Sequence, residues 1–291
     1  MSKVKIQGNA SGTGVVTLTA PNTNTDRTIT LPDGTATLAT KENFTSTGID
    51  DNATSTAITI DASENVGIGV TPESWTVYRA LQLGETGALG ANSATMGIGQ
   101  NWKFDGGNKY ISTTTATRYL QSAGAHTFYV APAGTADTAI SWTTAMTIDN
   151  AGRMTIPNQP AFSVRRSSTS ATSTHSIPDF DTVNHNIGSH YNTSTNRFTA
   201  PVSGVYSFSG HVIPVGLAQN SSFELWISLN STSVRWFMDR QAKNEATAAG
   251  TFGVGGATSI YIPANDYVQL VTTSKSYADE TNCWFSGQLI G

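Results

Sequence analysis

Short runs in which apolar and polar residues alternate recur along the whole chain. In the first 160 residues each run is brief, and two successive runs are separated by Pro, Asp, Asn or Gly. Alternation with a period of two is typical of β-strands, and these intervening residues favour tight turns. The pattern therefore predicts β-hairpins at Thr28 to Ala39, Ala57 to Val70 and Ala145 to Pro157, with turns at Pro32 to Gly34, Asp61 to Asn65 and Asn150 to Gly152.

Each predicted hairpin directs alternate apolar residues to one face. These pairs are Ile29 and Leu31, Ile58 and Ile60, and Met146 and Ile148. An isolated two-stranded hairpin is only marginally stable in water. We therefore expect the hairpins to need partners, in the form of copies of themselves from other chains.

Residues 75–142 are more aromatic, and we expect them to form a small β domain of their own, of a fold that the pattern does not name. Residues 157–160, with two prolines in four positions, indicate a linker. From Ala161 onward the runs lengthen to 8 to 12 residues with strict alternation, as in Tyr206, Phe208 and Val212. Several long strands separated by Gly, Asn and Ser loops predict a β-sandwich or jelly roll.

Composition supports an all-β chain. The sequence is rich in Thr, whose branched Cβ suits a strand better than a helix. Charged residues make up only 12%, about half the usual ~25%. The chain nevertheless carries 6 Trp, 9 Tyr and 11 Phe, so it has the aromatic content of a folded protein.

Charge and cysteine usage argue against several classes of function. A net charge of -4 with scattered Lys and Arg disfavours nucleic acid as a partner. The opening residues have no apolar region typical of a secretory signal. The sequence contains no run of 18 apolar residues, so no membrane-spanning segment is predicted. Cys283 is the single cysteine, so neither an internal disulfide nor a cysteine-based zinc site is expected.

The last 130 residues resemble the C1q-like domain, a trimeric jelly roll related to tumour necrosis factor. The resemblance rests on an aromatic signature with fixed spacing, met by Phe180, Asn186, Tyr191, Phe198, Gly204, Tyr206 and Phe208. The signature's final aromatic is replaced by Gly210. RFTAPVSGVYSF in the middle and CWFSGQLIG at the terminus also agree with the family. The resemblance implies a C-terminal jelly-roll sandwich and a homotrimer.

In such trimers the strand face opposite Tyr206 and Phe208 looks toward the threefold axis. The resemblance therefore implies a trimer interface that contains Val205, His211, Ile213 and Trp284. Three copies of His211 around the axis leave an ion there open as an alternative, although a small polar residue tolerated at the axis is the favoured interpretation.

The first 160 residues resemble shaft and attachment segments of tailed-bacteriophage fibres, in phrases such as ITIDASENVGIGVTPESW. This resemblance implies a virion-attachment segment at residues 1–45, a β-hairpin shaft at 46–157 and a C1q-like knob at 158–291. We expect a trimeric tail fibre, assembled in the bacterial cytoplasm, released by lysis and located in the virion. Its N-terminal segment would contact other virion proteins, and its knob would bind a host cell-surface glycan or outer-membrane protein.

Two alternatives stay open. In the first, the chain is a virion decoration, adaptor or head fibre, and the C1q-like domain is mainly a trimerisation cap. In the second it is a polysaccharide depolymerase. The second is disfavoured because the chain lacks both a nucleophile elbow and the repeat period of a β-helix. We expect no catalytic residue and no cofactor.

Candidate receptor contacts lie on the C-terminal half. Trp226 alternates with core positions and points away from them, Trp236 follows nearby, and Asn220 and Asn244 lie in polar loops expected at 216–222 and 238–250. Exposed aromatics and loops on a rigid sandwich are common recognition elements.

Metal-binding residues are sparse. His185 and His190 lie in a loop-like stretch, and Asp33, Asp61, Asp149 and Asp181 do not form a calcium loop motif. Three of these Asp residues occupy turn positions that favour Asp for its hydrogen bonding. We therefore expect no metal site, while calcium remains an open alternative.

Overall fold

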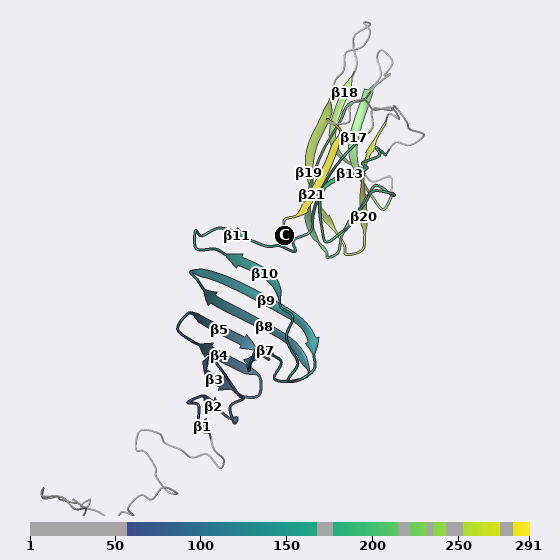
Figure 1. The fold of residues 1–291 in the computed structure, drawn as a ribbon. Helices are drawn as coiled ribbons and strands as arrows, with labels where there is room; N and C mark the ends of the chain where they lie inside the picture. Colours follow the sequence, from purple (N-terminus) through teal and green to yellow (C-terminus); the bar gives the residue numbers. More distant parts are fainter. Residues whose placement is uncertain (1–56, 168–176, 215–221, 232–234, 243–252, 274–281) are drawn as a thin grey trace, which may run out of the picture. The chain divides into compact units, whose positions relative to one another are not determined.

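The computed structural model describes residues 57–167, 177–214, 222–231, 235–242, 253–273 and 282–291, and every regular element among them is a β-strand (Figure 1). The all-β fold class is thereby confirmed for the described chain. No helix long and apolar enough to cross a bilayer occurs among the described residues. The predicted attachment segment 1–45 and the hairpin Thr28 to Ala39 lie outside them.

Residues 58–155 form one nine-stranded sheet with the order β1-β2-β3-β4-β5-β8-β9-β10-β11 (Figure 1). Its strands are β1 (Ile58–Ile60), β2 (Val66–Ile68), β3 (Arg79–Leu83), β4 (Gly87–Ala91), β5 (Thr95–Gln100), β8 (Thr114–Ser122), β9 (Ala125–Gly134), β10 (Thr143–Ile148) and β11 (Met154–Thr155). A separate two-stranded sheet comprises β6 (Lys103–Phe104) and β7 (Asn108–Lys109). The pairing of β2 with β3 is parallel, and the other pairs are antiparallel.

Both described hairpins form where the alternation predicted them. In the β1–β2 turn, Asp61 Oδ1 accepts hydrogen bonds from the backbone N–H groups of Ser63 at 2.8 Å and Asn65 at 2.9 Å. In the β10–β11 turn, Asp149 Oδ1 accepts from Ala151 and Arg153 in the same way. Hydrogen bonds from Asn65 and Arg153, respectively, lower the pKa of each Asp. Both carboxylates therefore stabilise turns.

The hairpins have strand partners, as expected, but these partners come from the same chain and not from other copies. Hairpin β1–β2 pairs with β3, and hairpin β10–β11 pairs with β9, so both are continuous with the strands of residues 75–142. The structure thus shows that segment as the middle of one sheet and not as a separate β domain. The physical reason is that a hairpin edge carries unpaired N–H and C=O groups, which neighbouring strands of the same chain satisfy here.

One face of the nine-stranded sheet is covered by aromatic side chains. Trp102 is fully buried and makes edge contacts with Trp75 and Tyr78, with centroids at 5.1 and 5.7 Å. Its ring lies directly on β5, because a Cβ built on Gly97 would lie 2.9 Å from it. Position 97 therefore requires glycine, because a side chain there would collide with the Trp102 ring.

A buried cation completes this cover. The Arg118 guanidinium lies 5.0 Å from each of the rings of Trp102, Tyr129 and Trp142, and Nη1 donates to Asn108 Oδ1 at 2.7 Å. Burial lowers the pKa of Arg118. Contacts with three aromatic faces partly replace the hydration that the cation loses.

The C-terminal residues form a sandwich of two five-stranded sheets, ordered β13-β12-β21-β16-β19 and β14-β15-β20-β17-β18. The strands are β12 (Ala161–Arg165), β13 (Thr182–Ile187), β14 (Tyr191–Asn192), β15 (Arg197–Thr199), β16 (Gly204–Val212), β17 (Ser222–Leu229), β18 (Arg235–Ala242), β19 (Val254–Ile262), β20 (Tyr267–Thr272) and β21 (Trp284–Leu289). All pairs are antiparallel. Strand β18 extends to Ala242, so the first part of the predicted loop 238–250 is strand.

The core between the two sheets contains the aromatic signature. Its aromatic members share almost complete burial and stacked or edge contacts, and they are Phe180, Tyr191, Phe198, Tyr206 and Phe208. Asn186 has another role. Its Nδ2 donates to the Tyr191 carbonyl at 2.8 Å, and its Oδ1 accepts from the Tyr191 N–H at 3.1 Å. The five-residue spacing between them therefore closes the β13–β14 loop.

Gly210 explains why the last signature aromatic is absent. It lies on β16 with its Cα facing the core, and a Cβ there would lie 2.9 Å from Leu270 Cδ2. Leu270 is itself 1% exposed and belongs to the core cluster. The leucine of β20 occupies the space that an aromatic at position 210 would need.

Restoring the aromatic should be tolerated only when this space is vacated. We expect Gly210→Phe to destabilise the full chain by about 1–3 kcal/mol through overpacking. Leu270→Ala alone should cost about 2–5 kcal/mol through the cavity it leaves. The double variant should lose less unfolding free energy than the two single variants lose in sum, as measured by urea unfolding. Strictly additive losses would contradict the assignment.

Candidate functional site

The outward face of the sheet β13-β12-β21-β16-β19 is the candidate site. Because Tyr206 and Phe208 point into the core, the alternating positions of β16 point outward. These positions are Val205, Ser207, Ser209 and His211. We call this surface the outer face.

The middle of the outer face is built from small polar side chains. The register aligns one row as Ser163, Ser286, Ser209 and Ala257, and the next as Ala161, Gln288, Ser207 and Ser259. The hydroxyls of Ser209 and Ser286 hydrogen bond at 2.8 Å across their strands. Side chains this short let another surface approach the sheet closely.

His211 and Trp284 lie at one end of the outer face, opposite each other on β16 and β21. His211 Nδ1 lies 2.6 Å from the Asn282 carbonyl oxygen and donates to it, since a carbonyl can only accept. The ring rests on the glycine backbone of β19, where a Cβ on Gly255 would lie 2.7 Å from His211 Cδ2. His211 is therefore held in place within its own chain.

The other end of the outer face is apolar. Val205, which is 37% exposed, pairs with Tyr261 of β19, which is 61% exposed. The Ile290 N–H donates to the Val205 carbonyl at 2.9 Å, and its side chain is also exposed. The sequence reasoning did not include Tyr261. Its position between the inward Ile260 and Ile262 is the pattern that could have identified it.

Three of the four residues predicted for a trimer interface, Val205, His211 and Trp284, thus lie on the outer face. Ile213 does not continue the alternation, because β16 ends at Val212. Its N–H lies 3.3 Å from Cys283 Sγ, and its side chain packs against the core. The structure therefore places Ile213 at the edge of the core.

The predicted receptor contacts are not assembled by the described residues. Trp226 points away from the core, as expected, but it is only 6% exposed, next to an irregularity in the β17–β18 register. Trp236 pairs with the core residue Ile227 and packs against the core. Asn220 and Asn244 lie outside the described residues.

No group of three or more His, Cys, Asp or Glu side chains suited to a metal ion occurs in the described part of the chain. Asp181 Oδ1 and Oδ2 accept from the N–H and hydroxyl of Ser167, both at 2.7 Å. Burial raises the pKa of Asp181, but the hydrogen bonds from Ser167 outweigh this effect and lower it. The carboxylate therefore already has protein partners.

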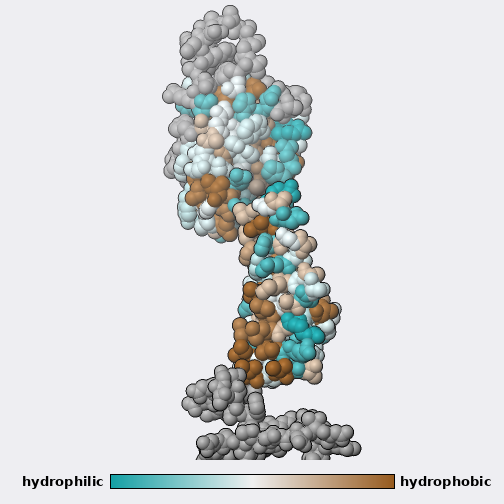
Figure 2. Space-filling view, turned by 90° about the vertical axis from the view of Figure 1, so that its left-hand side faces the viewer, coloured by the Kyte–Doolittle hydropathy of each residue, from teal (hydrophilic) through white to brown (hydrophobic). Residues whose placement is uncertain are grey.

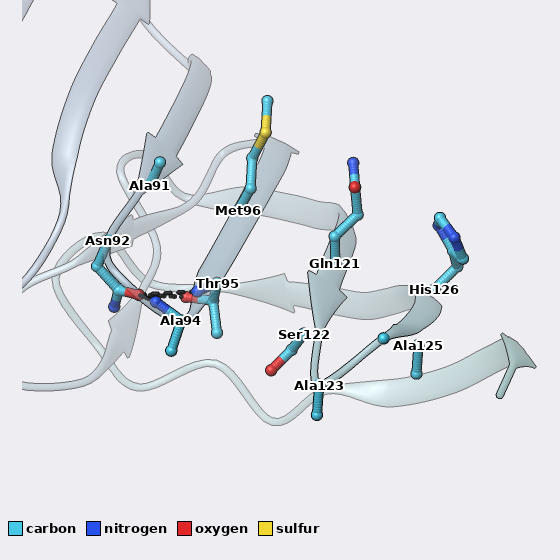
Figure 3. Close-up of a pocket in the computed structure, with 11 residues that line it drawn as sticks. Ala91, Asn92, Ala94, Thr95, Met96, Gln121, Ser122, Ala123, Ala125 and His126 are labelled. Atoms are coloured by element: carbon cyan, nitrogen blue, oxygen red, sulfur yellow. Dashed lines mark hydrogen bonds between the residues drawn. The ribbon is translucent and has the colours of Figure 1, made fainter. Parts of the chain in front are cut away.

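An open hollow of ≈ 490 Å³ lies on the nine-stranded sheet beside the β4–β5 and β8–β9 turns (Figure 3). Among its lining residues His126 is the one titratable side chain. General acid–base catalysis needs groups placed to exchange protons with a substrate. The lining offers no second titratable group to act with His126.

The family model described as C1q domain matches residues 161–290. A complement C1q subcomponent of the mouse, Mus musculus, is 26% identical over 141 residues, which are 48% of this chain and 53% of that protein. Its counterpart in the rat, Rattus norvegicus, is 25% identical over 121 residues, or 41% and 47% of the two chains. This chain therefore spans about half the length of the curated relatives it matches.

Among solved structures, the globular domain of zebrafish complement 1qA is 22% identical, covers 46% of this chain and 98% of its own, and gives a TM-score of 0.35. The family match identifies residues 161–290 as a C1q domain with a jelly-roll fold.

Two adjacent residues of β19 test which face is which. Ile260 is 5% exposed, so Ile260→Ala should cost about 2–5 kcal/mol of unfolding free energy. Tyr261→Ala should change it by no more than about 0.5 kcal/mol in dilute, dissociated chain. Urea unfolding of the full chain measures both. Equal losses at the two positions would show that the outer face is incorrectly assigned.

Proposed function

We propose that the chain is a homotrimeric fibre of a tailed-phage virion whose C1q domain binds the host cell surface. The observation that carries this proposal is the outer face of the C1q domain. Its centre is uncharged, exposed Val205 and Tyr261 lie at one end, and half-buried Trp284 lies at the other. Apolar surface with few charges is typical of the core of a permanent interface.

Three outer faces packed around an axis would remove Val205 and Tyr261 from water. The serine rows would permit the close approach that this packing needs. Arg165 of β12 is charged and lies outside the serine rows, opposite Trp284 at the end of the outer face. A charged side chain at the margin of an interface adds little desolvation cost to association, because it stays in contact with water.

The fibre role is supported by the likeness of residues 1–160 to phage shaft and attachment segments. Residues 58–155 form strands joined by tight turns, which suits a shaft. In this role residues 1–45 contact other virion proteins, and the chain reaches the medium by lysis. The knob then meets a glycan or an outer-membrane protein of the host. Three sites on one knob raise the effective concentration without new contacts.

One observation favours a second function. Trp226 is buried and Trp236 packs against the core, so these rings contribute little surface to a receptor contact. A decoration protein, adaptor or head fibre that uses the C1q domain mainly as a trimerisation cap would need no such contact.

A charge in the centre of the outer face should weaken self-association. We expect Ser207→Glu to raise the dissociation constant at least tenfold, because three like charges would be brought together near the axis. Sedimentation of the full chain over a concentration series measures this. Ser194→Glu, an exposed change in the β14–β15 loop of the other sheet, is the control. Equal association of the two variants would contradict a trimer built on the outer face.

Host binding has its own test. The full chain, fluorescently labelled, should bind intact host bacteria and slow adsorption of the phage in proportion to its concentration. Protease treatment of the cells should abolish binding to a protein receptor and leave binding to a glycan intact. A trimer that is present in purified virions but neither binds cells nor competes with the phage for adsorption would favour the alternative in which the C1q domain is mainly a trimerisation cap.

A further inference from the structure

The second face of the nine-stranded sheet is bare among the described residues. Aromatic side chains cover one side of this sheet, as described above. On the other side the register aligns a continuous apolar row across eight strands, which we call the apolar row. Its members are Ile60, Val66, Leu81, Leu89, Ile98, Tyr119, Phe128 and Met146.

Further apolar residues flank the apolar row. Ile58, Ile68 and Leu83 are opposite one another in the adjacent positions of β1, β2 and β3. Figure 3 shows Met96, Gln121 and His126 pointing to a common side from β5, β8 and β9. Figure 2 shows hydrophobic residues, in brown, gathered over the lower part of this domain, where β1 to β5 lie in Figure 1. We call the whole surface the bare face.

The bare face is larger than an isolated domain normally exposes. Nine large apolar side chains on it are between 37% and 69% exposed: Ile58, Ile60, Ile68, Leu83, Met96, Ile98, Phe128, Val130 and Met154. Together they present on the order of 800 Å² of apolar surface, against roughly 300–600 Å² for the largest patch of a typical monomer. A standard stable interface buries about 800 Å² per partner.

The bare face offers little to a polar ligand. Its one permanent charge, Arg79, lies at the margin on β3 and is paired with Glu64 at 3.3 Å. Within it the Tyr119 hydroxyl hydrogen bonds to His126 Nδ1, and the two rings stack. These two polar groups therefore satisfy each other. The partner that matches such a surface is another apolar surface with few charges.

We infer that the bare face packs against the same face of other copies of this chain, three sheets enclosing their apolar rows around one axis. This rests on the homotrimer proposed above. The C1q domain would then hold three identical bare faces on tethered chains, at high effective concentration. The exposed apolar area is of the same order as the area that a stable interface buries, and self-pairing brings no unpaired charge into it.

The test separates this interface from that of the C1q domain. In the Ser207→Glu background, which removes the outer-face contribution, Ile98→Asp should raise the dissociation constant of the full chain at least tenfold. The control is Val202→Asp, since Val202 is 47% exposed and lies between β15 and β16, outside the nine-stranded sheet. Equal sedimentation of the Ile98→Asp and Val202→Asp chains would overturn the inference. If Ser207→Glu itself changes nothing, only the outer-face proposal fails.

A milder variant guards against misfolding of Ile98→Asp. Ile98→Cys in the otherwise unchanged chain should yield covalent oligomers with a short thiol cross-linker, while Val202→Cys should not. The native Cys283 is fully buried and does not compete. Failure of Ile98→Cys to cross-link, or a monomer in which its thiol is nevertheless protected, would assign the bare face to another occupant, such as residues 1–56 of the same chain.

Discussion

Every β-sheet has two faces, and the described residues of this chain enclose only one face of the nine-stranded sheet. Trp102 and its aromatic neighbours cover one side of that sheet, and the chain has no second layer for the other side among its described residues. In the C-terminal domain the two sheets cover each other, and the outward surface is made of small residues. Surface left uncovered by a chain must either be tolerated in water or be covered by a neighbour. The low charge content is compatible with the second solution, because few side chains oppose close approach.

The local elements were predictable because their causes are local. Asp61 and Asp149 form turns with residues at most four positions away, and the alternation around Tyr206 and Phe208 assigns the core face directly. The aromatic spacing was also informative, since Asn186 bonds to Tyr191 within one loop. These features depend on few residues and on strand geometry alone.

The rest depends on contacts between distant positions. The glycines of β4 and β5 weaken the strand pattern, and their purpose is visible only when the Trp102 ring is seen to lie on them. The continuity of the nine-stranded sheet depends on β5 pairing with β8, across the intervening two-stranded sheet. The alternation also ends at Val212, before Ile213, and the sequence pattern does not indicate this end. At Trp226 the alternation correctly predicted a side chain that points away from the core. Such a side chain can still be buried by its neighbours, and periodicity does not predict this burial.

The position of Cys283 has a chemical consequence. Its sulfur is completely buried and receives the N–H of Ile213. A thiol reacts with oxidants and disulfides only where the reagent can reach its sulfur, and complete burial removes that access. The folded domain therefore presents the same covalent structure in a reducing compartment and in aerated medium.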